Sequence, residues 1–325
     1  MKSYWMGVAD GVAQVELRQC QRPEPGPNQI LIRMRAAGLN RGEFLLKHGL
    51  HKGSDAKPIG IEAAGEVISV GSEVTGFKPG DEVFGRCQGG FSEYVLLSDK
   101  EAIHKPASLS WEKAGGLALT GTTAHDCVVL QGNIKAGEWV FIAGVSSGVG
   151  VASLTMAKAL GAKVIGTSGS QHKLDQLKPL GLDVGLCMRG PGFYDVVMEA
   201  TSNKGVDLVV NTVGGTVFEE CIRILGFQGR LATVGYVDDV VEAKIDLKTL
   251  HARRLRLFGV SNKQRTAAQK AEFVPHFKEQ IVPLAAQGKM PVLIDRVFPF
   301  DQLKDAIAMM EAGEHVGKIV LQGTP

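Results

Sequence analysis

Short apolar segments alternate with helix-like segments from about residue 139 to about residue 260. EWVFIAG, VDLVVNTVG and GRLATVGY are almost continuously apolar, and intervening segments such as VGVASLTMAKALG carry apolar residues at positions i, i+3 and i+4. Strands that are apolar on both faces are typical of a parallel sheet covered by helices. The pattern therefore predicts α/β architecture, with βαβ units around a doubly wound parallel sheet. Three glycines occupy expected helix C-caps: Gly161, Gly181 and Gly226.

The first 110 residues follow a different pattern. NQILIRMRAAGLN alternates apolar and polar positions, as a half-buried strand does, and AAGEVISVGSEV predicts two short strands around Gly71. Glycines and prolines fall between such runs, which favours a compact, barrel-like β unit.

The tail of the chain departs from the βαβ pattern and is compatible with a return to the first domain. QKAEFVPHFKEQIVPLAAQG predicts one longer helix, and VLIDRVFPF predicts a strand after it. A last helix is expected over DQLKDAIAMMEAG, with Asp301 as its N-cap and Gly313 at its end.

Length and composition limit the class of protein. The 325 residues suffice for about two domains, and a net charge of +2 without a dense basic run does not suggest nucleic acid or an acidic membrane surface as a partner. No apolar run is long enough to span a membrane, and MKSYWMGVADG lacks the apolar core of a signal peptide. Five cysteines are scattered singly, which favours reduced thiols. We expect a cytoplasmic protein that acts on a small-molecule substrate.

The glycine-rich stretch AGVSSGVG, residues 143–150, follows a predicted strand and precedes a predicted helix. Such a turn brings backbone N–H groups and the positive helix N-terminus to a phosphate, so the context favours a dinucleotide over a ligand-free turn. Its register is open. Either Ser153 stands at the third glycine position, or Gly150 is the last glycine and Ser147 replaces an earlier one.

The next predicted strand ends in TSGSQHK, which contains no acidic residue. NAD sites place a carboxylate at about this point to bind the ribose 2′-hydroxyl, and that carboxylate would repel a 2′-phosphate. Hydroxyl groups and Lys173 suit the phosphate instead, although a solvated lysine is also common at the start of a helix. We therefore expect NADP(H) as the cofactor.

Many segments, in order along nearly the whole chain, resemble the medium-chain dehydrogenases/reductases, and more narrowly their zinc-free quinone oxidoreductase branch, which includes zeta-crystallin. The similar segments are AAGLNRGEFLLKHG, PIGIEAAGEVISVGSEVTGFKPGDEVFG, GGFSEYVLL, LTGTTAHDCV, AGVSSGVG, VDLVVNTVGG, GRLATVGY and EHVGKIVL. The resemblance implies a GroES-like β-barrel catalytic domain from residues 1–118 and 268–325, a Rossmann domain from residues 119–267, and a cofactor between them. It also implies a homodimer joined through the edge of the Rossmann sheet near RLRLFGV.

Zinc-dependent members of this superfamily use a cysteine near position 40 and a histidine before the glutamate of the GxE segment. This chain has Asn40 and Ile61 at those positions, and only Cys87 stands where a structural zinc lobe would need four cysteines. Because isoleucine cannot bind a metal and asparagine is a poor zinc ligand, we predict that the chain has no zinc site.

Without zinc, reduction of a plain ketone lacks a Lewis acid, whereas quinones and α,β-unsaturated carbonyls accept hydride more readily. We therefore expect a zinc-independent NADPH-dependent oxidoreductase that transfers hydride to one of these acceptors. Three alternatives stay open: an enoyl or 2-alkenal reductase acting on acyl or lipid-derived enones, a non-catalytic NADPH-binding protein, and a metal-dependent alcohol dehydrogenase, which requires zinc in the protein.

The resemblance assigns expected site residues. Asn40 is expected near the nicotinamide and the substrate oxygen, and Thr123 near the nicotinamide amide. The alternatives are an asparagine that caps the backbone of a strand-end turn and a helix threonine whose hydroxyl is satisfied. The cofactor contacts it implies are Ser147, Gly148, Val149, Gly150, Ser168, Gly169, Lys173, Asn211, Val213, Gly235, Tyr236, Asn262 and Lys318. Departures from the family pattern fall at Leu45 and His51, where similar reductases often have tyrosines, and at Met188, which replaces a tyrosine beside the adenosine phosphate. Arg189 is placed to supply part of that phosphate contact.

Overall fold

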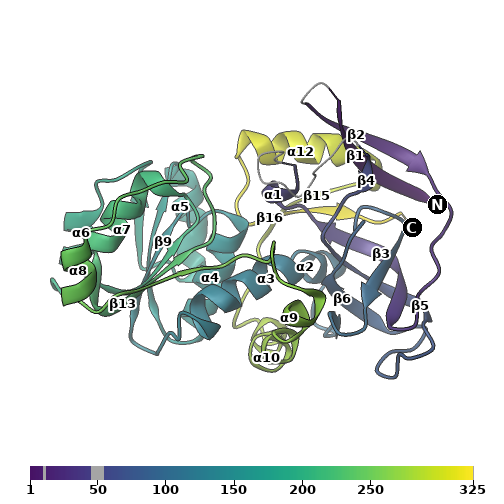
Figure 1. Cartoon of the computed structure of the whole chain (residues 1–325), viewed down its shortest axis with the longest axis horizontal. Coiled ribbons are helices and arrows are strands. Elements are labelled where there is room, and N and C mark those ends of the chain that lie inside the picture. The colour runs from purple at the N-terminus through teal and green to yellow at the C-terminus, as the bar shows by residue number, and fades with distance from the viewer. Residues whose placement is uncertain (10–11, 45–54, 325) are drawn as a thin grey trace. The chain divides into compact units, whose positions relative to one another are not determined.

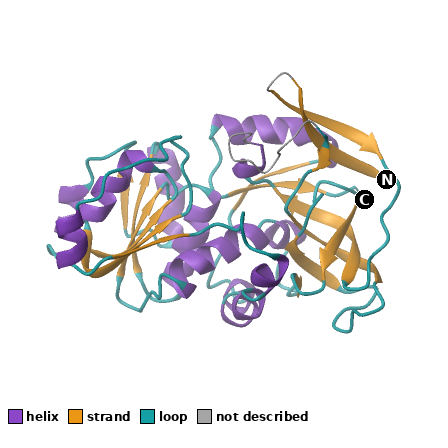
Figure 2. Ribbon diagram, viewed as in Figure 1, coloured by secondary structure: helices purple, strands orange, loops and turns teal. Residues whose placement is uncertain are grey.

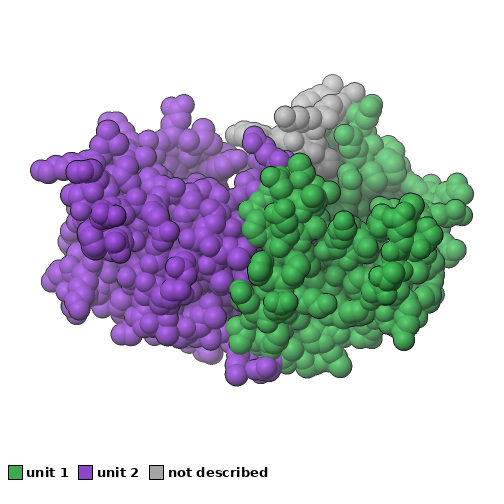
Figure 3. All heavy atoms as spheres, turned by 60° about the horizontal axis from the view of Figure 1, so that its bottom comes forward, with its two compact units in different colours: residues 1–120, 265–286, 292–325 green, residues 121–264, 287–291 purple. Residues whose placement is uncertain are grey.

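The computed structural model describes residues 1–9, 12–44 and 55–324. Its chain divides into two compact units, shown in different colours in Figure 3. Unit 1 comprises residues 1–120, 265–286 and 292–325, so it contains both chain ends, and unit 2 comprises residues 121–264 and 287–291. None of the described helices is both long enough and apolar enough to cross a membrane.

Unit 1 is built mainly from antiparallel strands (Figures 1 and 2). Its described strands form one sheet in the order β2-β1-β4 and a larger one in the order β15-β16-β3-β5-β6-β8, with β7 also paired to β3. They are β1 Lys2–Ala9, β2 Val12–Gln19, β3 Gln29–Gly38, β4 Lys57–Pro58, β5 Glu62–Val70, β6 Glu82–Arg86, β7 Tyr94–Ser98, β8 Ala102–His104, β15 Ile294–Phe298 and β16 Lys318–Gln322. The helices are α1 Arg41–Phe44, α2 Trp111–Gly115, α9 Ala267–Ala271, α10 Val274–Gln280, α11 Val282–Ala286 and α12 Leu303–Ala312.

β3 is the central strand of unit 1, because it pairs with β5, β7 and β16. Its pairing with β16 aligns Gly38 with Val320 and brings the C-terminal strand beside the N-terminal part of the chain. Ile30, Ile32 and Met34 of β3 alternate into the same apolar cluster, and the helix α12 closes that cluster with Leu303. This GroES-like barrel confirms the fold expected for the first domain.

Unit 2 is a parallel sheet in the order β11-β10-β9-β12-β13-β14, and helices flank both of its faces (Figures 1 and 2). The strands are β9 Trp139–Ala143, β10 Lys163–Ser168, β11 Val184–Cys187, β12 Val206–Asn211, β13 Leu225–Thr233 and β14 Arg256–Gly259. The helices are α4 Gly148–Ala159, α5 Gln171–Leu177, α6 Tyr194–Ala200, α7 Phe218–Arg223 and α8 Leu247–Ala252, while α3 Ala118–His125 runs across the boundary of the two units. The apolar strands lie in the core, as predicted for a doubly wound Rossmann sheet.

Several local expectations need correction. After β5, the described chain forms turns at Gly71 and enters its next strand only at Glu82, because the polar GSEVTGFKPG segment lacks a strand pattern. Gly226 lies inside β13 instead of capping a helix, whereas Gly161 and Gly181 do follow helices, with φ of 82° and 96°. The left-handed backbone at those two positions is what a glycine cap provides.

The expected long helix of the tail is three short helices, α9, α10 and α11. Pro275 is the second residue of α10, and Pro283 is the second residue of α11. Proline has no N–H group for the preceding turn, so it begins a new helix instead of continuing the old one. Asp301 lies in a 3₁₀ turn over Phe300–Gln302 and does not cap α12, but Gly313 ends that helix in the left-handed conformation, as expected.

Candidate active site

The glycine-rich turn joins β9 to the N-terminus of α4 and is fixed by its own side chains. Gly144 has a φ of 77°, which an L-residue with a side chain rarely adopts. Ser147 is the N-cap of α4: its hydroxyl accepts a hydrogen bond from the Gly150 amide at 3.1 Å and donates one to the Gly144 carbonyl at 2.8 Å. The turn is therefore closed without any ligand.

Gly150 is the glycine that allows α4 to pack tightly on the preceding turn. A Cβ atom at this position would collide with the carbonyl oxygens of Gly144 and Val145. Close packing of helix and strand is the role of the last glycine in a dinucleotide-binding turn. The geometry thus supports the register in which Gly150 is last and Ser147 replaces an earlier glycine, while Ser153 lies deeper in the buried face of α4.

A second group of residues lies at the carboxyl end of β10. Ser168 ends this strand, and its hydroxyl lies 3.0 Å from the Ser146 hydroxyl of the glycine turn. Arg189 lies across Gly169, because a Cβ atom added to that glycine would collide with the Arg189 guanidinium. Lys173 lies in the first turn of α5, which follows directly. The cations and hydroxyl groups expected around a 2′-phosphate therefore gather at one strand end.

The remaining expected contacts in unit 2 follow the next parallel strands. Asn211 ends β12, and its buried side chain accepts from the Val213 and Gly214 amides at 3.0 Å, so it builds the turn after the strand. Gly235 and Tyr236 follow β13, and Asn262 follows β14. Carboxyl ends of parallel strands meet at one edge of the sheet, which is where α/β folds bind ligands.

Unit 1 contains a buried polar network formed by Asn40, Glu43, Glu62 and Lys318. The Lys318 ammonium donates to the Leu39 carbonyl at 2.6 Å and to Asn40 Oδ1 and Glu62 Oε1, both at 2.8 Å. Three donors with three acceptors leave the ammonium saturated. Lys318 is 4% exposed and Glu62 is fully buried, so this ion pair is shielded from solvent.

Asn40 links this ion pair to a second carboxyl group. Its Nδ2 lies 3.0 Å from Glu62 Oε1, 3.2 Å from Glu43 Oε1 and 3.2 Å from the Gly38 carbonyl. The other oxygens of both glutamates accept from backbone amides: Glu43 Oε2 from Gly60 at 3.0 Å and Glu62 Oε2 from Leu119 at 2.7 Å. Asn40 Nδ2 therefore holds both carboxyl groups, while its Oδ1 accepts from Lys318.

The charges of this network balance only when one carboxyl group is protonated. Two buried carboxyl groups share one ammonium, Lys318, within the network. Burial raises the pKa of Glu43 to about 8, the Asn40 hydrogen bond and the Lys318 charge lower it, and the Glu62 charge raises it. Glu43 is thus largely a neutral acid at pH 7, whereas Glu62 and Lys318 form the ion pair.

Comparison with known families identifies both units. A family model for zinc-binding dehydrogenases matches residues 148–279, and a model for the GroES-like domain of alcohol dehydrogenases matches residues 26–107. The chain belongs to the medium-chain dehydrogenase/reductase family.

Solved structures of this family agree with that assignment over the whole chain. The Escherichia coli quinone oxidoreductase complexed with NADPH has 25% identity and a TM-score of 0.86, covering 99% of this chain and 100% of its own. A mycobacterial protein complexed with NADPH has 25% identity and a TM-score of 0.87, covering 99% and 100%. The CurK enoyl reductase has 26% identity and a TM-score of 0.86, covering 99% of each chain.

Curated relatives of this dehydrogenase/reductase chain include much larger proteins. One component of the phenolphthiocerol/phthiocerol polyketide synthase from Mycobacterium tuberculosis is 30% identical over 309 residues, which are 94% of this chain and 14% of that component. A highly reducing polyketide synthase from Alternaria alternata is 28% identical over 302 residues, which are 92% of this chain and 11% of that protein. The chain thus spans about one seventh or less of these relatives.

The family includes zinc enzymes, but the donors at this site do not fit zinc. Asn40 and Ile61 stand at the ligand positions, and the carboxylate of Glu62 is already engaged by Lys318, Asn40 and a backbone amide. The Lys318 ammonium, 2.8 Å from the Glu62 carboxylate, would repel a dication. Among the residues that the structure describes, no group of three or more histidine, cysteine or acidic side chains is arranged to hold a metal.

The structure thus places Asn40 and Lys318 in one network of unit 1, with their polar groups directed to each other and to Glu62. Thr123 lies in α3. The cofactor residues expected from TSGSQHK and from the glycine turn gather in unit 2, and Leu45 and His51 lie outside the described residues.

Sequence reasoning did not include Glu43 and Glu62 among the site residues. For Glu62 the signal was present, because an acidic residue inside the apolar run PIGIEAAGEV calls for a buried partner.

Proposed function

We propose that this chain is a zinc-independent reductase that transfers hydride from NADPH to a quinone or an α,β-unsaturated carbonyl compound. The observation that carries the proposal is the Lys318–Glu62–Asn40 network, whose hydrogen bonds are satisfied within the chain and leave no carboxylate or imidazole of the described residues available to a metal there. A site without a Lewis acid favours an acceptor that is already electron-poor.

NADPH is supported by the residues at the carboxyl end of β10. Ser168 and Gly169 lie beside Arg189, and the segment contains no carboxylate that would repel a 2′-phosphate. The amides at the N-terminus of α4, including Gly148 and Val149, suit the pyrophosphate. Two structural neighbours were solved with NADPH. When bound, NADPH supplies the hydride and becomes NADP⁺.

The chain's own residues contribute orientation and a store of protons. Hydride addition to an enone leaves an enolate that needs one proton, and reduction of a quinone needs a proton on oxygen. The neutral Glu43 carboxyl group holds a proton at neutral pH, and Asn40 ties it to the rigid Glu62–Lys318 pair. We propose that the proton on the product comes from solvent or from a neutral carboxyl group such as that of Glu43.

An enoyl or 2-alkenal reductase acting on acyl or lipid-derived enones is the second candidate. It is favoured by the likeness to the CurK enoyl reductase and to polyketide synthases. The likeness to the Escherichia coli quinone oxidoreductase favours the quinone. A non-catalytic NADPH-binding role is the third, and it predicts binding without turnover.

We further propose that two copies of the chain pair through β14. In the described sheet this strand has one neighbour, β13, and no further strand covers its other edge, where the Gly259 carbonyl accepts from Gln131 Nε2 at 3.4 Å. The chain has a mass of 34.7 kDa, and light scattering should then give twice that value. Leu257→Pro should shift the protein to monomers, because proline removes a backbone hydrogen-bond donor from the strand. A monomeric wild-type protein would overturn this proposal.

A panel of acceptors tests the reaction. Purified protein is assayed for NADPH oxidation with 1,4-benzoquinone, 9,10-phenanthrenequinone, trans-2-hexenal, crotonyl-CoA and, as the saturated control, hexanal. The proposal predicts turnover with quinones or enones and none with hexanal. Preference for crotonyl-CoA or hexenal over both quinones supports the enoyl reductase. Tight NADPH binding with no turnover on any acceptor would support the non-catalytic role and reject the reductase.

A further inference from the structure

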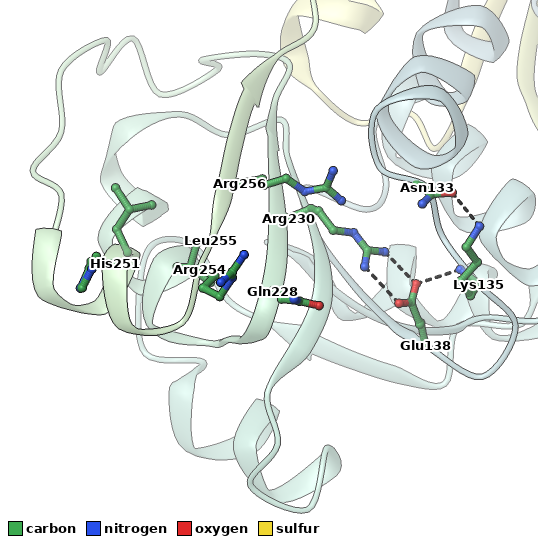
Figure 4. Close-up of a pocket in the computed structure, with 10 residues that line it drawn as sticks. Asn133, Lys135, Glu138, Gln228, Arg230, His251, Arg254, Leu255 and Arg256 are labelled. Atoms are coloured by element: carbon green, nitrogen blue, oxygen red, sulfur yellow. Dashed lines mark hydrogen bonds and ion pairs between the residues drawn. The ribbon is translucent and has the colours of Figure 1, made fainter.

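Unit 2 contains a hollow of about 780 Å³ that is strongly basic (Figure 4). Four of its lining residues are cations and one is an anion, so its formal charge is +3 while the whole chain carries +2. The charged residues that line it are Lys135, Arg230, Arg254, Arg256 and Glu138. We call this cavity the basic hollow.

The basic hollow lies at the amino ends of the parallel strands. Glu138 immediately precedes β9, and Arg256 is the first residue of β14. The glycine turn follows the opposite, carboxyl end of β9 at Ala143. The basic hollow is therefore separate from the edge of the sheet that carries the dinucleotide residues.

One arginine of the basic hollow is already neutralised. Arg230 donates to both carboxylate oxygens of Glu138, at 3.0 and 2.7 Å, and its Nε donates to the Gly132 carbonyl at 2.7 Å. Figure 4 shows this two-pronged pair, with Lys135 beside Glu138. A bidentate arginine–carboxylate pair of this kind is rigid, so it fixes one wall of the cavity.

The other arginines have no such compensation. Arg256 is the direct neighbour of Arg230 across the β13–β14 pair, and like charges opposite each other destabilise a sheet. Within the described part of the chain, the side chains of Arg254 and Arg256 make no hydrogen bond or ion pair. Figure 4 shows Arg256 next to Arg230 and Arg254 next to Leu255. Unpaired guanidinium groups around one concavity attract an anion.

The backbone around the basic hollow is also strained. Asn133, Gln228 and Arg254 have φ of 46°, 60° and 53°, and they are three of the six non-glycine residues with positive φ in the described chain. Asparagine tolerates this conformation, but glutamine and arginine rarely adopt it. Strained residues that gather around one cavity are a recurrent feature of binding sites.

We propose that the basic hollow binds a small molecule that carries one or more phosphate groups. Guanidinium groups match the geometry of phosphate oxygens and bind them in bidentate fashion. Leu250 and Leu255 are its apolar lining residues, and no phenylalanine, tyrosine or tryptophan lines it, so the geometry favours the phosphate itself over a stacked base. This inference does not depend on the proposed reductase activity.

The test uses inorganic pyrophosphate as the probe and the whole chain saturated with NADPH, so that the dinucleotide residues are not available to the probe. Calorimetry is expected to give saturable binding to the wild-type protein. Arg254→Gln/Arg256→Gln should raise the dissociation constant at least about tenfold, because two charge-assisted contacts are lost. The control Lys244→Gln/Lys289→Gln removes the same charge from exposed positions elsewhere and should bind like the wild type.

Three results would overturn the proposal: no binding at millimolar pyrophosphate, equal loss in both double variants, or unchanged binding in the arginine variant. Citrate is the comparison ligand, and tighter binding of citrate than of pyrophosphate would overturn the phosphate assignment. Circular dichroism with and without NADPH checks that each variant is folded.

A second variant separates strain from binding. Gln228→Gly keeps the φ of 60° without the side-chain penalty and leaves the arginines in place. It is expected to raise the melting temperature and to retain pyrophosphate binding within about threefold. A lower melting temperature of Gln228→Gly would contradict the claim that the backbone at Gln228 is strained.

Discussion

The Lys318 ammonium lies 2.8 Å from the Glu62 carboxylate, and their side chains are 5% and 0% exposed. A buried ion pair is costly to desolvate, so it persists only where additional hydrogen bonds satisfy both groups. Asn40, the Leu39 carbonyl and the Leu119 amide complete those bonds here. Together with Asn40, this pair therefore forms a closed polar centre of unit 1.

Lys318→Met should strongly destabilise the protein, because it leaves the Glu62 carboxylate buried without a counter-charge. The expected loss in free energy of unfolding is about 3–5 kcal/mol, measured by urea denaturation. The double variant Glu62→Gln/Lys318→Met removes both charges and should recover part of that loss. A loss below about 1 kcal/mol in the single variant would show that the pair is not buried in solution.

Glu43→Gln should change how stability depends on pH. The folded protein raises the pKa of Glu43 from 4.5 to about 8, so between these values the folded state binds more protons than the unfolded state. The contribution of Glu43 to the free energy of unfolding should therefore be complete below about pH 4.5 and should be lost as pH rises through about 8.

Glutamine cannot ionise, so the free energy of unfolding of Glu43→Gln should fall less with pH than that of the wild type. The difference between the two declines should be on the order of several kcal/mol between pH 5 and about 9. Urea denaturation at intervals of pH measures it. Glu242→Gln, at an exposed position, is the matched control and should follow the wild type. If the free energy of unfolding depended on pH in the same way in the wild type and in Glu43→Gln, the carboxyl group with the raised pKa would not be that of Glu43.

Arg189→Ala should weaken binding of NADPH but not of NADH, because its guanidinium lies over Gly169 beside Ser168. Loss of one charge-assisted phosphate contact is expected to raise the dissociation constant for NADPH about tenfold or more. Fluorescence titration with both cofactors measures this. Lys244→Ala serves as the charge control, and equal weakening of both cofactors would mean that Arg189 acts on the fold instead.

Ser147→Ala should destabilise unit 2 by about 1 kcal/mol, because it removes the hydroxyl that caps α4 and accepts from the Gly150 amide. Ser147→Gly is the matched variant and should lose only a few tenths of a kcal/mol, since glycine is also favourable at an N-cap. Equal losses in the two variants, measured by urea denaturation, would show that the cap bond contributes little.

The two fold types could be predicted from the sequence because each has a distinct apolar period. EWVFIAG and VDLVVNTVG became β9 and β12 of a parallel sheet, and NQILIRMRAAG became the central β3 of the barrel. The secondary structure of long, strongly periodic segments can be predicted, because the spacing of their apolar residues determines which face is buried.

Local breaks and buried charges were harder to predict. The helical period in the tail ran through Pro275 and Pro283, although each proline in fact begins a new helix. The pKa of Glu43 depends first on burial and then on Asn40, Glu62 and Lys318, and Lys318 is far away in the sequence. Sequence spacing cannot give such a value, because tertiary contacts determine it.

The central claim is direct hydride transfer to an electron-poor acceptor without a metal. It is tested most directly with NADPH deuterated at the transferable C4 position, chelator-treated protein and the acceptor preferred in the panel. For an enone, we predict deuterium at the β-carbon of the saturated product, and for a quinone, we predict a primary isotope effect on NADPH oxidation. Both should be unchanged by chelator. Loss of activity on chelation, restored by zinc, would contradict the account.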